Sequence, residues 1–260
     1  MPVDWNEVNK ALSPVKDYED LCHRLQASLA YPFVRDAYNL TLPELADYTT
    51  RLLGGDARRR YTDYLAWLTR SMAALGQCAV LDIQDLVSRT ASRHHLEAFT
   101  GQGGAAAQEV VGVLKYLLYW VIPMEKYLSG LVQSDPAMST AIQALGTLGI
   151  RTNLQLLQQG IGATGRKALA ASSGLPESVV LDLVNRADLS RLPWASKATI
   201  ANIIGAGYGS LRQLASAHPE QLYADFFRYG KAIGKNLKLG NEIENSYRIA
   251  QIVPELVQEG

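Results

Sequence analysis

Cysteine is scarce in this sequence, and its scarcity excludes a fold held together by disulfide bonds. The chain has 260 residues but only two cysteines, Cys22 and Cys78, whereas small secreted domains that depend on disulfides use several pairs. Hydrophobic residues make up 48% of the chain, which is enough to build a sizeable buried core. No basic and apolar leader stands at the N-terminus, so we expect a protein of the reducing cytoplasm.

An excess of charge of one sign is also missing. The chain carries 25 basic and 25 acidic side chains, which cancel. Proteins that coat nucleic acid regardless of its sequence are strongly basic, so this balance argues against that class. The first 150 residues are slightly acidic and the remainder is slightly basic, which is too mild an asymmetry to identify a partner.

A long uninterrupted apolar run is absent as well. The one stretch that invites a membrane interpretation, Val110 to Met124, would span about 22 Å as a helix, against roughly 30 Å of hydrocarbon. Lys115 and Pro123 interrupt it. We therefore expect no transmembrane segment and interpret this stretch as the central helix of a bundle. A peripheral membrane contact remains the alternative.

Recognisable catalytic and metal-binding motifs are missing too. His94 and His95 are adjacent, so on a helix they point about 100° apart and do not form a pair of ligands. The glycine-rich stretches GQGG and GIGATG follow no predicted strand and lack the Gly-Lys-Ser/Thr of a phosphate-binding loop. We expect a non-enzymatic protein with no catalytic residues, no metal and no cofactor.

Helical periodicity, in contrast, is abundant and predicts an all-α fold. Between Asp17 and Ala30, apolar and small side chains recur every three or four residues, at Leu21, Cys22, Leu25 and Leu29. Thr41 and Glu44 have the spacing of a capping box, with Pro43 in the first turn of the helix that they begin.

Two longer helices are predicted to complete the N-terminal half. From Asp56 to Phe99 the chain keeps a helical period without proline, which predicts one very long helix, bent near Gly76. A second long helix is predicted from Ala105 to Gln133, with a kink at Pro123. We therefore predict a bundle of long helices over residues 1–133, a connecting helix over 134–149 and a compact domain of short helices over 150–260.

Aromatic side chains on the two long helices leave an alternative role open for the bundle. They are Tyr61, Tyr64, Trp67, Tyr116, Tyr119, Trp120 and Tyr127. Such residues line cavities for small apolar ligands or pigments between helices, but ordinary core packing uses the same pattern.

The second half carries a resemblance to a known family. The residues behind it fall in three places: Thr164, Gly165, Arg166, Leu169 and Ala170; then Asn185, Ala187, Asp188, Leu189 and Arg191; then Ser210, Leu211, Leu214, Ala215, Pro219 and Leu222. With these residues the chain, over about residues 150–250, resembles an uncharacterised bacterial family of helix-hairpin-helix domains. The resemblance implies no activity. Independently of it, the residue pattern predicts helices at about 196–205 and 210–216, with Ser196 and Ser210 as caps. The side chains predicted to face inward are Leu189, Leu192, Ile200, Ile203, Ile204, Leu211 and Leu214. The N-terminal half resembles no family that we recognise.

The predicted hairpin departs from the pattern that binds phosphate. In DNA-binding members of the wider class, a Leu-Pro-Gly-x-Gly turn leaves main-chain N–H groups open to a phosphate. Here the turn reads LPWAS, Leu192 to Ser196, so that Trp194 stands where the first glycine would allow close approach.

Two hypotheses therefore compete with that of a ligand-binding bundle. In the first, the protein is a scaffold or adaptor that binds another protein or itself, with Trp194 as a candidate contact. In the second, it is a DNA- or RNA-binding accessory protein that contacts phosphates electrostatically. The candidate residues for the second are Arg191, Ser196 and Lys197 beside the turn, and the basic run Lys231, Lys235 and Lys238.

Overall fold

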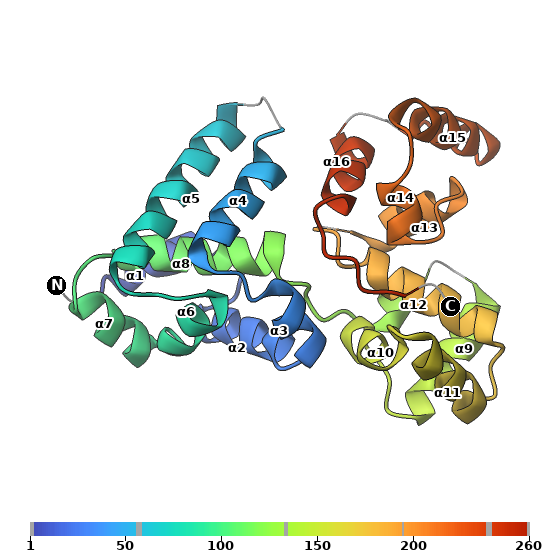
Figure 1. Ribbon diagram of the computed structural model, residues 1–260, viewed down its shortest axis with the longest axis horizontal. Coiled ribbons are helices and arrows are strands. Elements are labelled where there is room, and N and C mark those ends of the chain that lie inside the picture. Colours follow the sequence, from blue (N-terminus) through green and yellow to red (C-terminus); the bar gives the residue numbers. More distant parts are fainter. Residues whose placement is uncertain (1–2, 56–58, 133–134, 194, 238–240, 259–260) are drawn as a thin grey trace. The chain divides into compact units, whose positions relative to one another are not determined.

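A computed structural model describes residues 3–55, 59–132, 135–193, 195–237 and 241–258. These residues form sixteen α-helices and no strand, so the predicted all-α class is confirmed (Figure 1). The chain divides into two compact units, Met1–Met124 and Glu125–Gly260, and each is described by itself.

The first unit is built from eight α-helices. They are α1 (Trp5–Leu12), α2 (Tyr18–Leu29), α3 (Pro32–Tyr38), α4 (Leu42–Leu53), α5 (Arg59–Gln77), α6 (Ile83–Arg89), α7 (Arg93–Gly101) and α8 (Ala107–Tyr116), and a π-helical turn, η1 (Leu117–Val121), extends α8. Helix α8 packs against α1 and α5, and α5 packs along α4 (Figure 1). The central position of α8 explains its apolar sequence, because its buried residues face neighbours on more than one side.

The local signals predicted α2 and α4 correctly. Leu21, Cys22, Leu25 and Leu29 are all buried on one face of α2. At the start of α4, the Thr41 hydroxyl accepts from the main-chain N–H of Glu44, and the Glu44 carboxylate accepts from the main-chain N–H of Thr41. This reciprocal pair is the capping box that the sequence predicts.

The single very long helix predicted between Asp56 and Phe99 is wrong, because the chain breaks there twice. Helix α5 ends at Gln77, and Ala79 adopts a left-handed conformation, with φ = 54°. Asp82 then caps α6 by accepting from the N–H of Asp85, and Ser92 caps α7 by accepting from the N–H of His95. These caps start new helices although the apolar period runs on through the breaks.

The second long helix is also shorter than predicted. It ends at Val121, and Ile122 is already extended, so Pro123 terminates the helix rather than kinking it. Proline disfavours the helical conformation of the residue before it, which accounts for this position of the end. Among the helices that the structure describes, none combines the length and the apolar character needed to cross a membrane.

The second unit contains the remaining helices. They are a 3-10 turn, η2 (Leu128–Gly130), followed by α9 (Pro136–Thr147), α10 (Asn153–Gly160), α11 (Ala163–Ser173), α12 (Glu177–Leu189), α13 (Lys197–Gly205), α14 (Leu211–Ala215), α15 (Pro219–Ala232) and α16 (Asn241–Ala250). Helix α12 is central and packs against α9, α10, α11 and α14. Helix α13 packs against α15, and α14 against α16.

The helices predicted at about 196–205 and 210–216 are confirmed as α13 and α14. Ser196 accepts from the N–H of Thr199 and Ser210 from the N–H of Gln213, as N-caps do. Gly207, between the two helices, has a φ of +103°, which favours glycine. The apolar side chains predicted to face inward are buried, except that Ile204 is half-buried: Leu189, Leu192, Ile200, Ile203, Leu211 and Leu214.

Candidate functional site

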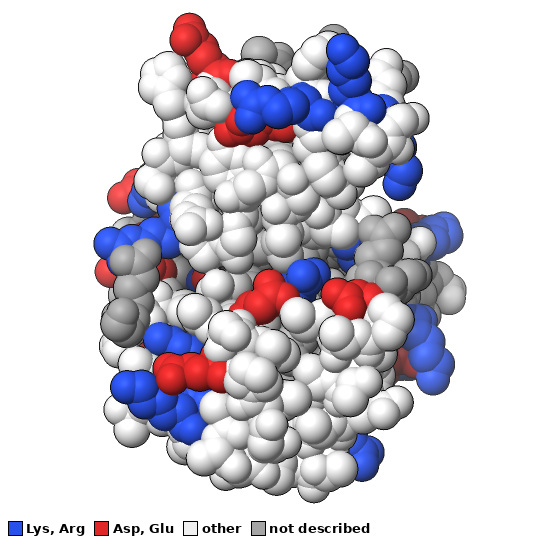
Figure 2. Space-filling view, turned by 90° about the vertical axis from the view of Figure 1, so that its right-hand side faces the viewer, with Lys and Arg blue, Asp and Glu red and all other residues white. Residues whose placement is uncertain are grey.

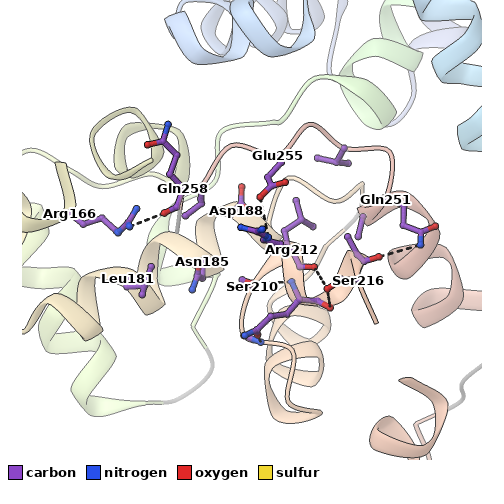
Figure 3. Close-up of a pocket in the computed structure, with 17 residues that line it drawn as sticks. Arg166, Leu181, Asn185, Asp188, Ser210, Arg212, Ser216, Gln251, Glu255 and Gln258 are labelled. Carbon is purple, nitrogen blue, oxygen red and sulfur yellow. Dashed lines mark hydrogen bonds and ion pairs between the residues drawn. The ribbon is translucent and has the colours of Figure 1, made fainter. Parts of the chain in front are cut away.

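A pocket of about 870 Å³ lies within the second unit, between α12, α14 and the C-terminal segment (residues 251–258) (Figure 3). Helix α12 contributes Leu181, Asn185 and Asp188, whose spacing of four and three residues places them on one face. Ser210, which caps α14, and Arg212 on that helix line the opposite side. The pocket thus joins three parts of the chain that are far apart in sequence.

The C-terminal wall of this pocket is held by two buried arginines. Arg191 pairs with Asp188 and donates from Nη2 to the main-chain oxygen of Pro254, at 2.9 Å. Arg166 donates to the main-chain oxygens of Ile161 and Gln258, each at 2.9 Å. A buried guanidinium group whose N–H groups are hydrogen-bonded to carbonyls is costly to move. The C-terminal wall of the pocket is therefore formed before any ligand arrives.

The lining of the pocket mixes apolar and amide side chains. Val253, Glu255 and Val257 line it from alternate positions, which is the spacing of an extended chain. Leu181 remains 36% exposed, and the half-buried amide of Asn185 has no hydrogen-bond partner among the described residues. The pocket therefore offers both an apolar surface and a side chain that can donate and accept hydrogen bonds.

Charge contributes little to the pocket. Arg212 and Glu255 stand at its rim with 3.5 Å between Nε and Oε1, and both side chains are more than half exposed. Asp188 is paired with Arg191, and Arg166 is occupied by carbonyls. A pocket with its charges satisfied in this way favours a ligand that is largely uncharged.

The connection between α12 and α13 is also fixed from inside the unit. The Lys126 ammonium donates to the main-chain oxygens of Ser190, at 2.7 Å, and Ala195, at 3.1 Å. The Asn153 side chain donates to the Ser190 hydroxyl, at 2.9 Å. Burial lowers the pKa of Lys126 to about 8. The two ends of the connection are thus held together by a side chain from a distant part of the unit.

The residues predicted to contact nucleic acid lie in different environments. The Arg191 side chain is completely buried behind the pocket wall and pairs with Asp188, so it presents no surface to a phosphate. Ser196 caps α13 and is exposed, as is Lys197 beside it. Lys231 and Lys235 are exposed at the end of α15. The predictions on Trp194 and Lys238 lie outside the described residues.

The pocket itself was not predicted. The spacing of Leu181, Asn185 and Asp188 was a usable signal for one wall, since it places these side chains on one face of a helix. The C-terminal segment had no such signal. Its role depends on hydrogen bonds to Arg166 and Arg191, which are remote in sequence.

The aromatic residues of the first unit contact one another. Tyr64 and Trp67 stack with ring centroids 6.0 Å apart, and Tyr61 meets Trp120 edge to face, at 6.1 Å. A Cβ atom added to Gly112 would come within 2.1 Å of the Trp67 ring, so that ring lies directly on α8. These contacts use aromatic faces that an apolar ligand in the bundle would need.

Part of the chain matches a known protein family. Residues 137–243 match the family described as a domain of unknown function (DUF4332). The comparisons with curated proteins and with solved structures give no match. The match begins in α9 and ends in α16, so it includes two walls of the pocket, whereas the C-terminal segment lies beyond it. An uncharacterised domain is what the sequence resemblance implied for this half.

Proposed function

We propose that the protein is a non-enzymatic scaffold or adaptor, and that its second unit is a helix-hairpin-helix module that docks a segment of a partner protein in the pocket between α12, α14 and the C-terminal segment. The preformed pocket carries this proposal. Its volume, about 870 Å³, is within the range of specific binding sites, roughly 300–1,000 Å³. Because the buried arginines already fix its wall, little ordering cost opposes binding.

The groups available to a ligand favour a protein segment over nucleic acid. Leu181, Val253 and Val257 suit apolar side chains, and the Asn185 amide suits a main-chain peptide group. A phosphate backbone in this pocket would need available cations there, yet Arg166 is bound to main-chain carbonyls and Arg212 lies beside the Glu255 carboxylate. We thus propose that the helix-hairpin-helix module is a rigid support on which a segment of the partner protein docks.

A variant of Leu181 tests this proposal against a matched control. Leu181→Arg puts a long charged side chain at the pocket, whereas Leu148→Arg changes a leucine of similar exposure that does not line it. Each full-length variant would be affinity-purified from its native host after nuclease treatment, and its partners identified by mass spectrometry. We expect a protein partner that binds the wild type and Leu148→Arg but is lost from Leu181→Arg.

The same partner, once purified, should bind the wild type at least tenfold more tightly than Leu181→Arg, because a charge would be desolvated in the pocket. Equal binding to both variants would contradict the role of the pocket. Recovery that depends on intact nucleic acid would favour the nucleic-acid hypothesis instead.

A further inference from the structure

The C-terminal segment leaves part of its main chain without hydrogen bonds. Residues 254–258 form neither helix nor turn, and the pocket-lining side chains of Val253, Glu255 and Val257 have the alternate spacing of an extended chain. The main-chain N–H and C=O groups of Glu255 and Val257 form no hydrogen bond with any described residue. Because buried main-chain polar groups are nearly always hydrogen-bonded, these groups are open to water or to a partner.

The other edge of the same segment is bonded within the second unit. The main-chain oxygen of Pro254 accepts from Arg191, and that of Gln258 accepts from Arg166, each at 2.9 Å. The N–H of Gln258 donates to the main-chain oxygen of Ile161, at 3.0 Å. Both main-chain groups of Gln258 thus point to one side, as they do in a strand.

This pattern gives the segment one occupied edge and one free edge. In an extended chain, the main-chain groups of alternate residues point to the same side. Those of residues 254, 256 and 258 therefore point toward the arginines, and those of Glu255 and Val257 point the opposite way. We call the N–H and C=O groups of Glu255 and Val257 the free edge.

We propose that the partner segment docks in the pocket as an extended chain that pairs with the free edge as an added strand. This inference rests on the proposed function and specifies the conformation of the partner segment. Main-chain hydrogen bonds to an unpaired edge are a common way to bind an extended peptide. Paired residues of neighbouring strands place their side chains on the same face, so alternate side chains of the added strand would face the pocket beside Glu255 and Val257.

The pocket also indicates which side chains the added strand carries. Leu181 and Val253 offer apolar contacts within the pocket, whose charged groups are already paired. The face of the molecule in Figure 2 is mostly covered by uncharged side chains, with acidic and basic groups interspersed. A helical segment would satisfy its own main-chain groups and leave the free edge unpaired. We therefore expect an extended, largely uncharged segment with apolar residues at alternate positions.

Peptide selection on the full-length protein tests this inference. A displayed library of random short peptides would be panned on the wild type and counter-selected on Leu181→Arg, so that only peptides that need the pocket remain. One selected peptide would be synthesised in three forms: unmodified, N-methylated at alternate odd positions and N-methylated at alternate even positions. Because only every second N–H of a strand faces its neighbour, we expect one methylated form to bind at least about tenfold more weakly and the other within about threefold.

Two proline variants test the free edge from the side of the protein. Val257→Pro removes an N–H of the free edge, whereas the matched control Leu256→Pro removes an N–H that points toward the arginines. Proline suits an extended chain and keeps the residue before it extended, and exchange of the Gln258 amide checks that the wall stays folded. We expect Val257→Pro to bind the unmodified peptide about fivefold more weakly or worse, because a carbonyl of the peptide is left unpaired, and Leu256→Pro to bind it within about twofold of the wild type.

The outcomes separate this inference from the function on which it rests. Equal binding of the two methylated forms, or of the two proline variants, would overturn pairing with the free edge, while loss of the peptide from Leu181→Arg would still support the pocket. A library that yields no peptide dependent on Leu181 would also overturn the inference. The affinity purification with Leu181→Arg and Leu148→Arg then decides the proposed function separately.

Discussion

The guanidinium group of Arg191 and the carboxylate of Asp188 meet in the interior of the second unit, with 2.6 Å between Nη2 and Oδ1. Burial raises the pKa of Asp188, and the charge of Arg191 opposes this rise. Because Arg191 also donates to the Pro254 carbonyl, the pair joins the end of α12 to the C-terminal segment. Both residues are among those that carry the resemblance to the helix-hairpin-helix family. Their buried ion pair gives them a structural role.

Arg191→Ala should strongly destabilise the second unit. Removing one partner leaves the other charge buried without compensation, which costs about 3–5 kcal/mol. Amide hydrogen exchange in α12 reports on this unit separately from the first, so its free energy of opening should fall by this amount.

The double variant Arg191→Met with Asp188→Leu is the control for this effect. It removes both charges and keeps apolar volume, so its loss of stability should be clearly smaller. An equal loss in the two variants would show that the hydrogen bond to Pro254, rather than the buried charge, determines the effect.

Lys126 should titrate well below an ordinary lysine. Burial lowers its pKa from 10.5 to about 8. A nuclear magnetic resonance titration of ¹³C-labelled lysine side chains should therefore show one resonance with a midpoint near 8, absent from Lys126→Met. If that variant loses only a resonance with a midpoint near 10.5, the prediction fails.

The same shift has a defined effect on stability. Between about pH 8 and 10.5 the folded protein has released the Lys126 proton and the unfolded chain still holds it, so the free energy of unfolding rises with pH through this window. Buried tyrosines such as Tyr64, whose pKa is raised to about 12, act in the opposite direction above pH 10. The contribution of Lys126 is therefore the difference between the pH profiles of the wild type and Lys126→Met, and it should increase with pH.

Local signals predicted helices well where a cap and an apolar period agreed. Thr41 with Glu44, and Ser196 and Ser210, mark the starts of α4, α13 and α14 as predicted. The prediction failed between α5 and α7, where the apolar period continues across Ala79 and hides the caps at Asp82 and Ser92. A period alone does not reveal a break that is set by one left-handed residue.

The pocket could not be predicted from the spacing of residues in the sequence. Its C-terminal wall is fixed by bonds between Arg191 and Pro254, 63 residues apart, and between Arg166 and Gln258, 92 residues apart. Arg191 and Lys197 are only six positions apart in the sequence, yet one is buried and the other exposed. Tertiary packing separates residues that sequence reasoning had placed in one basic cluster.

Gly165→Ala should destabilise the second unit because α11 begins against the end of α10. A Cβ atom at position 165 would lie 1.9 Å from the main-chain oxygen of Gln159, and main chain does not yield as a flexible side chain does. We expect a loss of about 1–3 kcal/mol in the free energy of opening of α11, measured by hydrogen exchange.

Gly146→Ala, in α9, is the matched control for this substitution. A Cβ atom there meets nothing within 4 Å, so the change should stabilise by up to about 1 kcal/mol by restricting the unfolded chain. Equal effects of the two substitutions would mean that helix propensity, rather than the approach of the Gln159 carbonyl, determines the outcome at position 165.

Arg166→Lys should loosen the C-terminal wall of the pocket while leaving the helices folded. The guanidinium reaches the oxygens of Ile161 and Gln258 with separate nitrogens, and a single ammonium group does not reproduce this fork. The N–H of Gln258 donates to Ile161, so its hydrogen exchange reports on the wall. We expect this amide to exchange about 10- to 100-fold faster, as losing a charge-assisted bond implies.

Arg186→Lys, at the more exposed pair with Asp182, is the control and should change the exchange rate of the Gln258 amide by less than about threefold. Unchanged protection of Gln258 in Arg166→Lys would show that the Arg166 guanidinium does not hold this end of the wall.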